Sequence, residues 1–399
     1  MHGAGGTQQT ERVAWWRRAL SVDPALPQAL GIVVGLRVGL GIVAAVTLTL
    51  IPSNSVGGDW LDLQLPTDAP AYALLAPWER WDALWYHHLA LSGYHTASDA
   101  AFFPLYPTLI RGLASLLGNA YLLSGLVIST IAYLVALVLL HRLVRMERDA
   151  ATADRTLLYL ALAPTAFFLL APYTEALFLA LTVATFLALR RRTWVAAGGL
   201  AALAALTRPT GILIVAPLLV AFVRDVRERR RKGARALAVG HVTLLLPLAA
   251  LAAWLLYTTT VLHIKGGPAA AYAPWTNGYA APWTVLTDSW NSITAGHHVE
   301  EAFNLGAIAV LVAAIAVMWR RLPGEYTAYS LVLLPVLLTR EVFFTPLASA
   351  ARYVVVVFPV FVVLAMAGRR LWLHRAVVAV SAPLMAMLFI AYVRFSFVG

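Results

Sequence analysis

Long apolar runs recur along the chain from Leu30 to its C-terminus, separated by short polar segments. Many of them approach the 17–25 residues or so that a helix needs to cross the hydrocarbon core of a bilayer. The pattern predicts an all-α polytopic membrane protein with about eleven transmembrane helices. No repeat or polar linker interrupts the array, so residues 1–399 are expected to form a single domain. The expected spans are residues 28–51, 120–141, 156–171, 174–189, 193–207, 210–223, 237–260, 302–319, 326–340, 353–367 and 376–393.

Composition supports the same class. The 399 residues are 61% hydrophobic and only 12% charged, with a mean hydropathy of +0.76, whereas soluble domains are about half apolar and a quarter charged. The absence of cysteine excludes disulfides and thiolate metal sites. Residues 1–27 lack the short apolar core and cleavage site of a signal peptide, so a cleaved leader is not expected.

The positions of the basic residues predict the topology. Lys and Arg concentrate on the cytoplasmic side of membrane proteins, and with eleven crossings every basic cluster falls on that side. Residues 1–27 are then a cytoplasmic basic arm, and the run at 224–235 is a topology determinant near anionic lipid, not a nucleic-acid site. Besides the arm, the clusters are residues 141–155, 190–192, 224–235, 320–321 and 368–375.

A different set of ionisable residues collects in the segments expected on the outer face. The two long outer loops are residues 52–118 and 261–300, and residues 101–118 are expected to form a half-embedded helix because a further crossing would invert every later loop. Charged groups at a membrane boundary are costly and are therefore functional candidates. Because the ionisable residues expected on this face all lie on one side of the membrane, we expect them to line a single outward-opening cavity. They are Glu79, Arg80, Asp82, Glu175, Arg208, Arg340, Glu341 and Arg352.

The segment from Trp78 to Tyr94 is expected to form a helix along the membrane surface. At helical spacing, Trp78, Trp81 and Trp85 form one stripe. Glu79, Asp82 and Tyr86 form the neighbouring stripe. Tryptophan favours the interface, so the segment is either an anchor without chemistry or an anchor that presents carboxylates to a cavity.

The outer arginines and Glu175 each have two interpretations. Arg208, in a Thr-Arg-Pro-Thr-Gly turn, and Arg352, at the head of a span, are suited to holding a phosphate through charge-assisted hydrogen bonds. Either side chain can instead simply extend to the interface. Glu175 can cap the helix that follows it, where a carboxylate is favourable, or contribute to the site.

Other chemistries have little support. The sequence contains no Gly-rich phosphate loop. The histidines of the pairs His87–His88 and His297–His298 are adjacent, so neither pair has the i, i+4 spacing of a helical metal site. We therefore expect no metal and no cofactor.

Five segments, in order, resemble the PIG-V type of mannosyltransferase, the GPI mannosyltransferase 2 family. Loop 261–300 and the last span show no such resemblance, which leaves the acceptor open. The segments are RWDALWYHHLALSGY (80–94), AFFPLYPTLIR (101–111), LAPTAFFLLAPYTEALFLAL (162–181), LTRPTGIL (206–213) and ASAARYVVVVFPVF (348–361).

The resemblance implies a GT-C fold whose active site opens to the non-cytoplasmic side, with interfacial helices and an essential acidic residue in the first outer loop. The family uses a lipid-phosphate sugar, dolichyl-phosphate mannose in eukaryotes. The Ala- and Arg-rich composition points to a bacterial plasma membrane, where the donor is expected to be polyprenyl-phosphate mannose. The expected partners are this donor, a lipid or glycolipid acceptor and membrane lipids, without nucleic acid.

The resemblance also orders the candidate residues for an inverting transfer to an acceptor hydroxyl. Asp82, in the Trp-Asp position of the family, is the expected general base, with Glu79 as the alternative. Arg208 and Arg352, and then Arg340, are expected to stabilise the departing phosphate. The remaining substrate-binding candidates are Arg80, Trp81, Trp85, Tyr86 and Glu175.

Two alternatives stay open. One is a GT-C enzyme that uses another lipid-linked sugar or a protein acceptor. The other is a transporter or flippase, although such proteins tend to show inverted repeats and ionisable groups near the bilayer midplane, whereas here the repeat is absent and the polar residues gather at one face.

Overall fold

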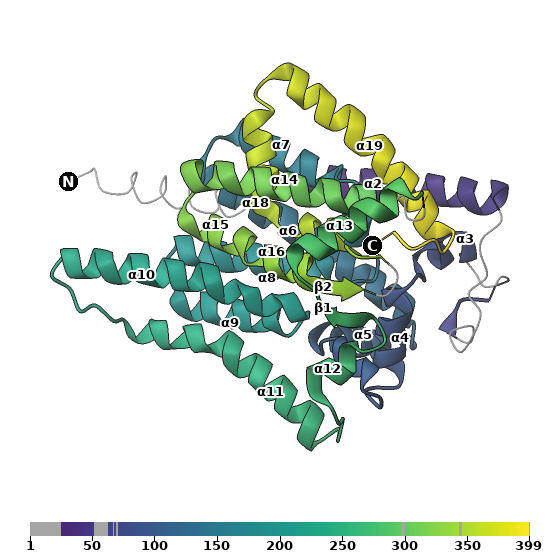
Figure 1. The fold of residues 1–399 in the computed structure, drawn as a ribbon, viewed down its shortest axis with the longest axis horizontal. Coiled ribbons are helices and arrows are strands. Elements are labelled where there is room, and N and C mark those ends of the chain that lie inside the picture. Colours follow the sequence, from purple (N-terminus) through teal and green to yellow (C-terminus); the bar gives the residue numbers. More distant parts are fainter. Residues whose placement is uncertain are drawn as a thin grey trace, which may run out of the picture.

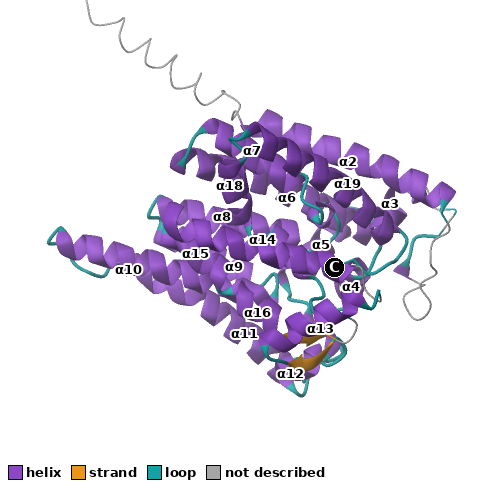
Figure 2. Ribbon diagram, turned by 45° about the horizontal axis from the view of Figure 1, so that its top comes forward, coloured by secondary structure: helices purple, strands orange, loops and turns teal. Residues whose placement is uncertain are grey.

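The computed structural model describes residues 25–51, 63–66, 68, 71–296, 300–342 and 345–398. These residues form helices that run mostly along the long axis of the molecule, together with one pair of short strands (Figures 1 and 2). Most of the predicted basic arm, part of loop 52–118 and His297–His298 lie outside the described residues.

Within this described part, six helices are long and apolar enough to cross a membrane, so the expectation of eleven crossings is wrong. The chain is a multi-pass integral membrane protein. Two of the six begin with a turn of 3-10 helix, η5 (Pro209–Ile214) and η6 (Val239–Leu245). The six are α2 (Ala25–Leu50), α6 (Tyr121–Glu147), η5 with α10 (Val215–Arg231), η6 with α11 (Leu246–Thr260), α14 (Glu300–Arg321) and α19 (Leu371–Val393).

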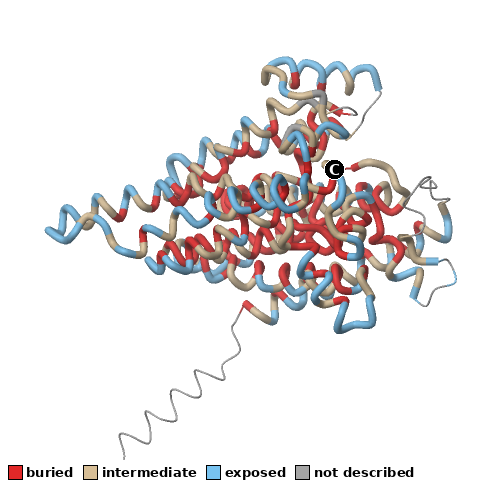
Figure 3. The backbone as a smooth tube through the Cα atoms, turned by 90° about the horizontal axis from the view of Figure 1, so that it is seen from below, coloured by how far each residue is buried: buried red, intermediate tan, exposed pale blue. Residues whose placement is uncertain are grey.

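The remaining predicted spans are too short to cross alone. The longest, α8, has 16 residues, which at about 1.5 Å per residue extend roughly 24 Å, less than the ~30 Å hydrocarbon core. Most residues of α8 are buried, and the helix packs against α6 and α9. Figure 3 shows that buried segments fill the interior of the molecule. These helices are α7 (Ala150–Ala161), α8 (Glu175–Arg190), α9 (Trp194–Ala205), α15 (Gly324–Leu331), α16 (Leu333–Thr339), α17 (Ala350–Val355) and α18 (Phe358–Ala367).

Proline explains several of the breaks. The chain leaves α7 at Ala161, passes Pro164, a short 3-10 helix η4 (Ala166–Leu169) and Pro172, and returns to α-helical geometry only at Glu175. Pro209 follows the end of α9 in the same way. Proline lacks an amide donor and pushes the preceding residue out of helical geometry. Each of these breaks therefore leaves irregular backbone inside the bundle.

A glycine permits a close approach between α9 and η6. A Cβ atom on Gly198 of α9 would lie 2.2 Å from the carbonyl oxygen of Thr243 in η6. No side chain fits there. The contact holds α9 against the start of α11, and the hydroxyl of Thr243 strengthens it by donating to the carbonyl of Trp194 at 2.8 Å.

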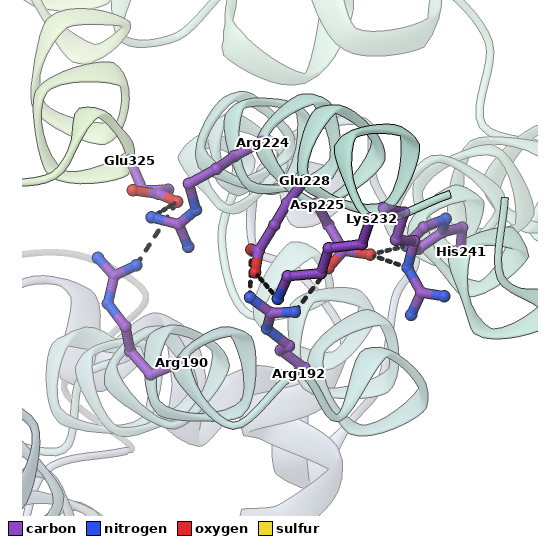
Figure 4. A network of polar contacts seen from close by, with 9 residues as sticks. Arg190, Arg192, Arg224, Asp225, Glu228, Lys232, His241 and Glu325 are labelled. Atoms are coloured by element: carbon purple, nitrogen blue, oxygen red, sulfur yellow. Dashed lines mark hydrogen bonds and ion pairs between the residues drawn. The ribbon is translucent and has the colours of Figure 1, made fainter. Parts of the chain in front are cut away.

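The basic clusters lie together at one end of the bundle. Figure 4 shows part of this end, where the buried carboxylate of Glu325 lies 2.7 Å from Arg224 and 3.5 Å from Arg190. Contacts also join the five clusters between residues 141 and 375, although these are far apart in sequence, so all five lie at the same end of the fold. These contacts are Arg190 with Glu147, Arg192 with Glu228, Arg148 with the carbonyl of Arg321, and Arg369 with Asp149.

The opposite end is built from short elements of both predicted outer loops. In the first loop they are α3 (Tyr72–Leu75), η2 (Ala76–Trp78), α4 (Asp82–Leu91), η3 (Ser98–Ala101) and α5 (Leu105–Leu116). Loop 261–300 contributes α12 (Gly267–Tyr272), β1 (Thr276–Tyr279) and α13 (Pro282–Thr294). A later segment adds β2 (Arg340–Val342).

The two strands are antiparallel and bring distant segments together. Gly278 lies opposite Glu341, and Tyr279 lies opposite Arg340. Loop 261–300 is thereby fixed beside the segment that carries Arg340. It is close to η3 in space as well, because the hydroxyl of Tyr272 donates to the carbonyl of Ala101 at 3.1 Å.

Candidate active site

A cavity of about 470 Å³ opens at this end, on the side of the molecule away from the basic clusters. Residues from eight stretches of the chain line it, and among them are two carboxylates, three arginines and a group of aromatic rings. The lining residues that the following argument uses are Trp81, Asp82, Trp85, Tyr86, Phe102, Arg208, Tyr272, Trp275, Glu300, Arg340, Arg352 and Phe397.

Asp82 lines the cavity as the first residue of α4. The predicted continuous helix from Trp78 is wrong, because the chain leaves helical geometry at Glu79 and re-enters it only after Trp81. Trp81 has φ 51° and ψ −117°, a conformation that costs a non-glycine residue about 1–3 kcal/mol and is found mostly at functional sites. The break places Asp82 at a helix N-terminus, where a carboxylate is favoured, and separates it from Glu79.

Four charged side chains form an alternating chain that starts at Asp82. Arg352 places Nη1 2.6 Å from Oδ2 of Asp82 and Nε 2.6 Å from Oε1 of Glu175. The same Glu175 oxygen lies 3.2 Å from Nη1 of Arg208. Asp82 and Arg208 are 126 positions apart in sequence, so only the fold brings this set together.

Glu175 lies beneath the arginines and not in the cavity wall. Its side chain is 0% exposed, so it cannot touch a substrate while these contacts persist. Glu175 does lie in the first turn of α8, as the helix-cap interpretation expects, but it also neutralises the buried guanidinium groups of Arg208 and Arg352. Its position is that of a group that orients Arg208 and Arg352.

The third cavity arginine, Arg340, lies near the same ring as Arg208. The guanidinium carbon of Arg208 is 4.6 Å from the centroid of the Tyr353 ring, and that of Arg340 is 6.0 Å from it. Stacking on an aromatic face orients a guanidinium while its edge stays free to donate hydrogen bonds. Arg208, Arg340 and Arg352 therefore present cationic edges to one volume.

The structure does not bring Glu79 and Arg80 to the cavity wall. Glu79 is 3% exposed and accepts a hydrogen bond of 2.8 Å from the amide of Leu65. Arg80 donates 2.9 Å to the carbonyl of Val393 and lies 3.8 Å from the ring centroid of Phe395. Both side chains connect the start of α4 with neighbouring segments, which is a structural role.

Glu79, which lies outside the six long helices, makes stability depend on pH. Burial raises its pKa from 4.5 to about 7, although the amide of Leu65 and Arg80 act in the opposite direction. The folded protein then holds a proton that the unfolded chain has lost, so stability is highest below pH 4.5 and falls as the pH rises to about 7. At about 1.4 kcal/mol per pH unit, the loss is roughly 3 kcal/mol.

We expect the variant Glu79→Gln, which mimics the protonated acid, to lose this pH dependence. Thermal unfolding in detergent at pH 5 and pH 8 measures it: the unfolding temperature of the wild type should fall by several degrees at pH 8, and that of the variant should fall much less. Asp288→Asn, on the exposed face of α13, serves as the control and should behave as the wild type does. Parallel wild-type and Glu79→Gln profiles would contradict the assignment.

Aromatic rings cover one wall of the cavity. The rings of Trp85 and Phe102 stack with centroids 5.1 Å apart, and Trp275 meets the edge of Trp85 at 5.4 Å. Phe397 meets Trp81 at 5.5 Å in an edge arrangement. Tyr86 lines the same space but is buried. Such a wall suits the face of a sugar ring or an isoprenoid chain.

Sequence reasoning missed five of the lining residues used here. Phe102 lies within a recognised segment but carries no charge or motif that distinguishes it. Nothing local distinguishes Tyr272, Trp275, Glu300 or Phe397 either, because the strand pair, α14 and the C-terminal segment bring them to the cavity only in the folded chain.

The described residues hold no group of three or more His, Asp or Glu side chains placed to bind a metal ion. The charged groups that face the cavity are the arginines, Asp82 and Glu300. Any anionic part of a ligand would therefore meet guanidinium groups.

Comparisons with known proteins agree with the resemblance seen in the sequence. Residues 68–281 match a family model described as Mannosyltransferase (PIG-V). No curated protein matches the chain.

Among solved structures, ArnT from Cupriavidus metallidurans bound to undecaprenyl phosphate is similar with a TM-score of 0.48 and 15% identity, over 92% of this chain and 76% of that chain. An oligosaccharyltransferase from Archaeoglobus fulgidus is similar with a TM-score of 0.43 and 15% identity, over 90% of this chain and 53% of that chain.

Proposed function

Since the chain belongs to the PIG-V family of mannosyltransferases, we propose that its cavity transfers mannose from a polyprenyl-phosphate donor to a hydroxyl of a lipid or glycolipid acceptor. The observation that carries this proposal is the meeting of Arg208, Arg340 and Arg352 with Asp82 in one cavity. Arginines suit a phosphate leaving group, and a carboxylate suits the activation of a hydroxyl.

The arginines supply the donor side of the reaction. When the bond between the anomeric carbon and the phosphate oxygen breaks, negative charge grows on the phosphate. Guanidinium groups held in place before the reaction stabilise that charge without needing to protonate the leaving oxygen. Glu175 keeps two of them oriented through contacts of 2.6 Å and 3.2 Å.

Asp82 supplies the acceptor side. Its carboxylate accepts the proton of the acceptor hydroxyl as the oxygen attacks the anomeric carbon from the face opposite the phosphate, so the configuration inverts. Before the donor binds, Asp82 is paired with Arg352 at 2.6 Å. A bound phosphate competes for Arg352, which frees Asp82 to act as a base only when the donor is present.

The architecture and orientation belong to the same proposal. We place the chain in the GT-C fold, because short helices of the first loop carry Asp82 to one end of a helical membrane bundle. The basic end, which includes Arg190, Arg224 and Arg321, is assigned to the cytoplasm by the positive-inside rule. The cavity then opens on the non-cytoplasmic face of a bacterial plasma membrane.

A transfer assay with purified protein tests the proposal. Radiolabelled polyprenyl-phosphate mannose, glucose and arabinose are supplied in turn with extracted bacterial membrane lipids as acceptors, and an acceptor-free reaction measures hydrolysis. We expect lipid-linked label from the mannosyl donor alone. Label from another donor would overturn the choice of sugar, and label that enters only added protein would overturn the acceptor class. Movement of the intact donor across vesicles without transfer would establish a flippase instead.

A further inference from the structure

A second hollow of the molecule lies at the basic end, on the outer face of α10. Seven residues of this helix line an open groove of about 670 Å³, here called the α10 groove. In Figure 1, α10 lies at the opposite end of the molecule from α4 and the strand pair, so the groove is separate from the cavity of Asp82. The lining residues are Leu219, Val220, Val223, Arg224, Arg227, Glu228 and Arg231.

The first half of the groove is apolar and uncovered. Leu219, Val220 and Val223 are between 36% and 53% exposed, and they belong to one of the six helices long and apolar enough to cross a membrane. Side chains of this kind, on the outside of a membrane helix, are suited to contact acyl chains.

The second half of the groove carries positive charge that the protein does not neutralise. Arg227 and Arg231 are one turn apart on the same face, and the described residues provide neither with a hydrogen-bond or ion-pair partner. The other cation, Arg224, is engaged at 2.7 Å by the buried carboxylate of Glu325.

The one acidic side chain that lines the groove, Glu228, is already paired with other cations. Glu228 contacts Arg192 and Lys232, the latter at 2.6 Å, as Figure 4 shows. It therefore does not neutralise Arg227 or Arg231.

We propose that the α10 groove binds an anionic phospholipid, with its phosphate between Arg227 and Arg231 and an acyl chain along Leu219, Val220 and Val223. The length of the groove favours a lipid over a free anion. Leu219 and Arg231 are about 18 Å apart along the helix, whereas one headgroup layer is roughly 5–8 Å thick. The groove thus extends from the headgroups into the hydrocarbon, and basic clusters beside membrane helices attract anionic lipids.

The test uses the absence of cysteine from the chain. A single Leu219→Cys substitution accepts a fluorophore inside the groove, and the labelled protein is placed in phosphatidylcholine vesicles containing brominated phosphatidylglycerol or brominated phosphatidylcholine. We expect the brominated anionic lipid to quench at about thirtyfold lower mole fraction, since each of the two arginines contributes about 1 kcal/mol near the surface and about 1.4 kcal/mol is a factor of ten.

Matched variants assign the preference to the groove. In the labelled protein, R227Q/R231Q should bring the two lipids to nearly equal quenching. R230Q/R235Q removes the same charge from exposed arginines outside the groove and should keep most of the preference. Equal quenching by both lipids in the parent, equal loss in both double variants, or displacement of the lipid by millimolar inorganic phosphate would overturn the proposal.

Discussion

Replacing Asp82 with asparagine is expected to lower the rate of mannose transfer by about a thousandfold, within the 10²–10⁴ range of general base catalysis. The amide keeps the size of the side chain and can still accept a hydrogen bond from Arg352, which lies 2.6 Å away, but it cannot take the acceptor's proton. Because the arginines that bind the phosphate stay in place, the KM for the donor should change much less than kcat.

The measurement is initial-rate transfer from radiolabelled polyprenyl-phosphate mannose. Asp288→Asn is the matched control, since it removes a carboxylate from an exposed position of α13 and should leave kcat unchanged. A folded Asp82→Asn protein that transfers mannose at a near-normal rate would refute Asp82 as the base. In that case Glu300, the other carboxylate of the cavity wall, would be the next residue to replace.

Replacing Glu175 with glutamine is expected to destabilise the protein by about 3–5 kcal/mol, the usual cost of leaving a buried ionic partner uncompensated. Glu175 is 0% exposed and contacts both Arg352 and Arg208. Its loss leaves two buried guanidinium groups without their shared anion. Transfer should also fall by at least a hundredfold, with a rise in the KM for the donor, because the arginines lose their orientation.

The surface offers a matched control. Glu228 also contacts two cations, Arg192 and Lys232, but it is a third exposed, so Glu228→Gln should change stability little. Thermal unfolding of the two glutamine variants and steady-state kinetics separate the effects. Glu175→Asp, which keeps the charge on a shorter side chain, should recover part of the stability and part of the donor affinity. A Glu175→Gln protein as stable and active as the wild type would exclude the orienting role.

Local signals predicted much of the candidate site. The sequence segments around Asp82, Arg208 and Arg352 indicated the family, and the family model, which matches residues 68–281, confirms the resemblance for the first two of these segments. These residues could be selected from sequence because charged groups stand out in an apolar chain, where burial makes them costly.

The number of membrane spans could not be predicted from hydropathy alone. A helix enclosed by other helices, such as α8, is as apolar as one that faces lipid, so α8 and the segments around it were counted as crossings. The length of a helix distinguishes an enclosed helix from one that crosses the membrane. The ends of α7 and α17, however, depend on prolines and tertiary contacts, which the spacing of apolar residues does not reveal.

Helical periodicity also placed Glu79 and Asp82 on one stripe. The backbone conformation of Trp81 separates them, and a positive φ at tryptophan has no local sequence signal. Trp81, Trp85 and Tyr86 of the aromatic wall were among the candidates, but their partners could not be predicted, for a related reason. Trp275 and Phe397 meet Trp85 and Trp81 only after segments distant in sequence have packed.

The short strand pair has a consequence for how the enzyme can change over evolution. It bonds loop 261–300 to the strand bearing Arg340, with Tyr279 opposite that arginine. Residues 261–281 of this loop, which include β1, lie within the family match, so the expectation that the whole loop lacks family resemblance is wrong for this part. Mutations that reshape this loop therefore also shift Arg340, a cation of the cavity wall. The loop and Arg340 are mechanically linked through this pairing, so the loop cannot be exchanged between relatives as an independent module unless the strand pairing is exchanged with it.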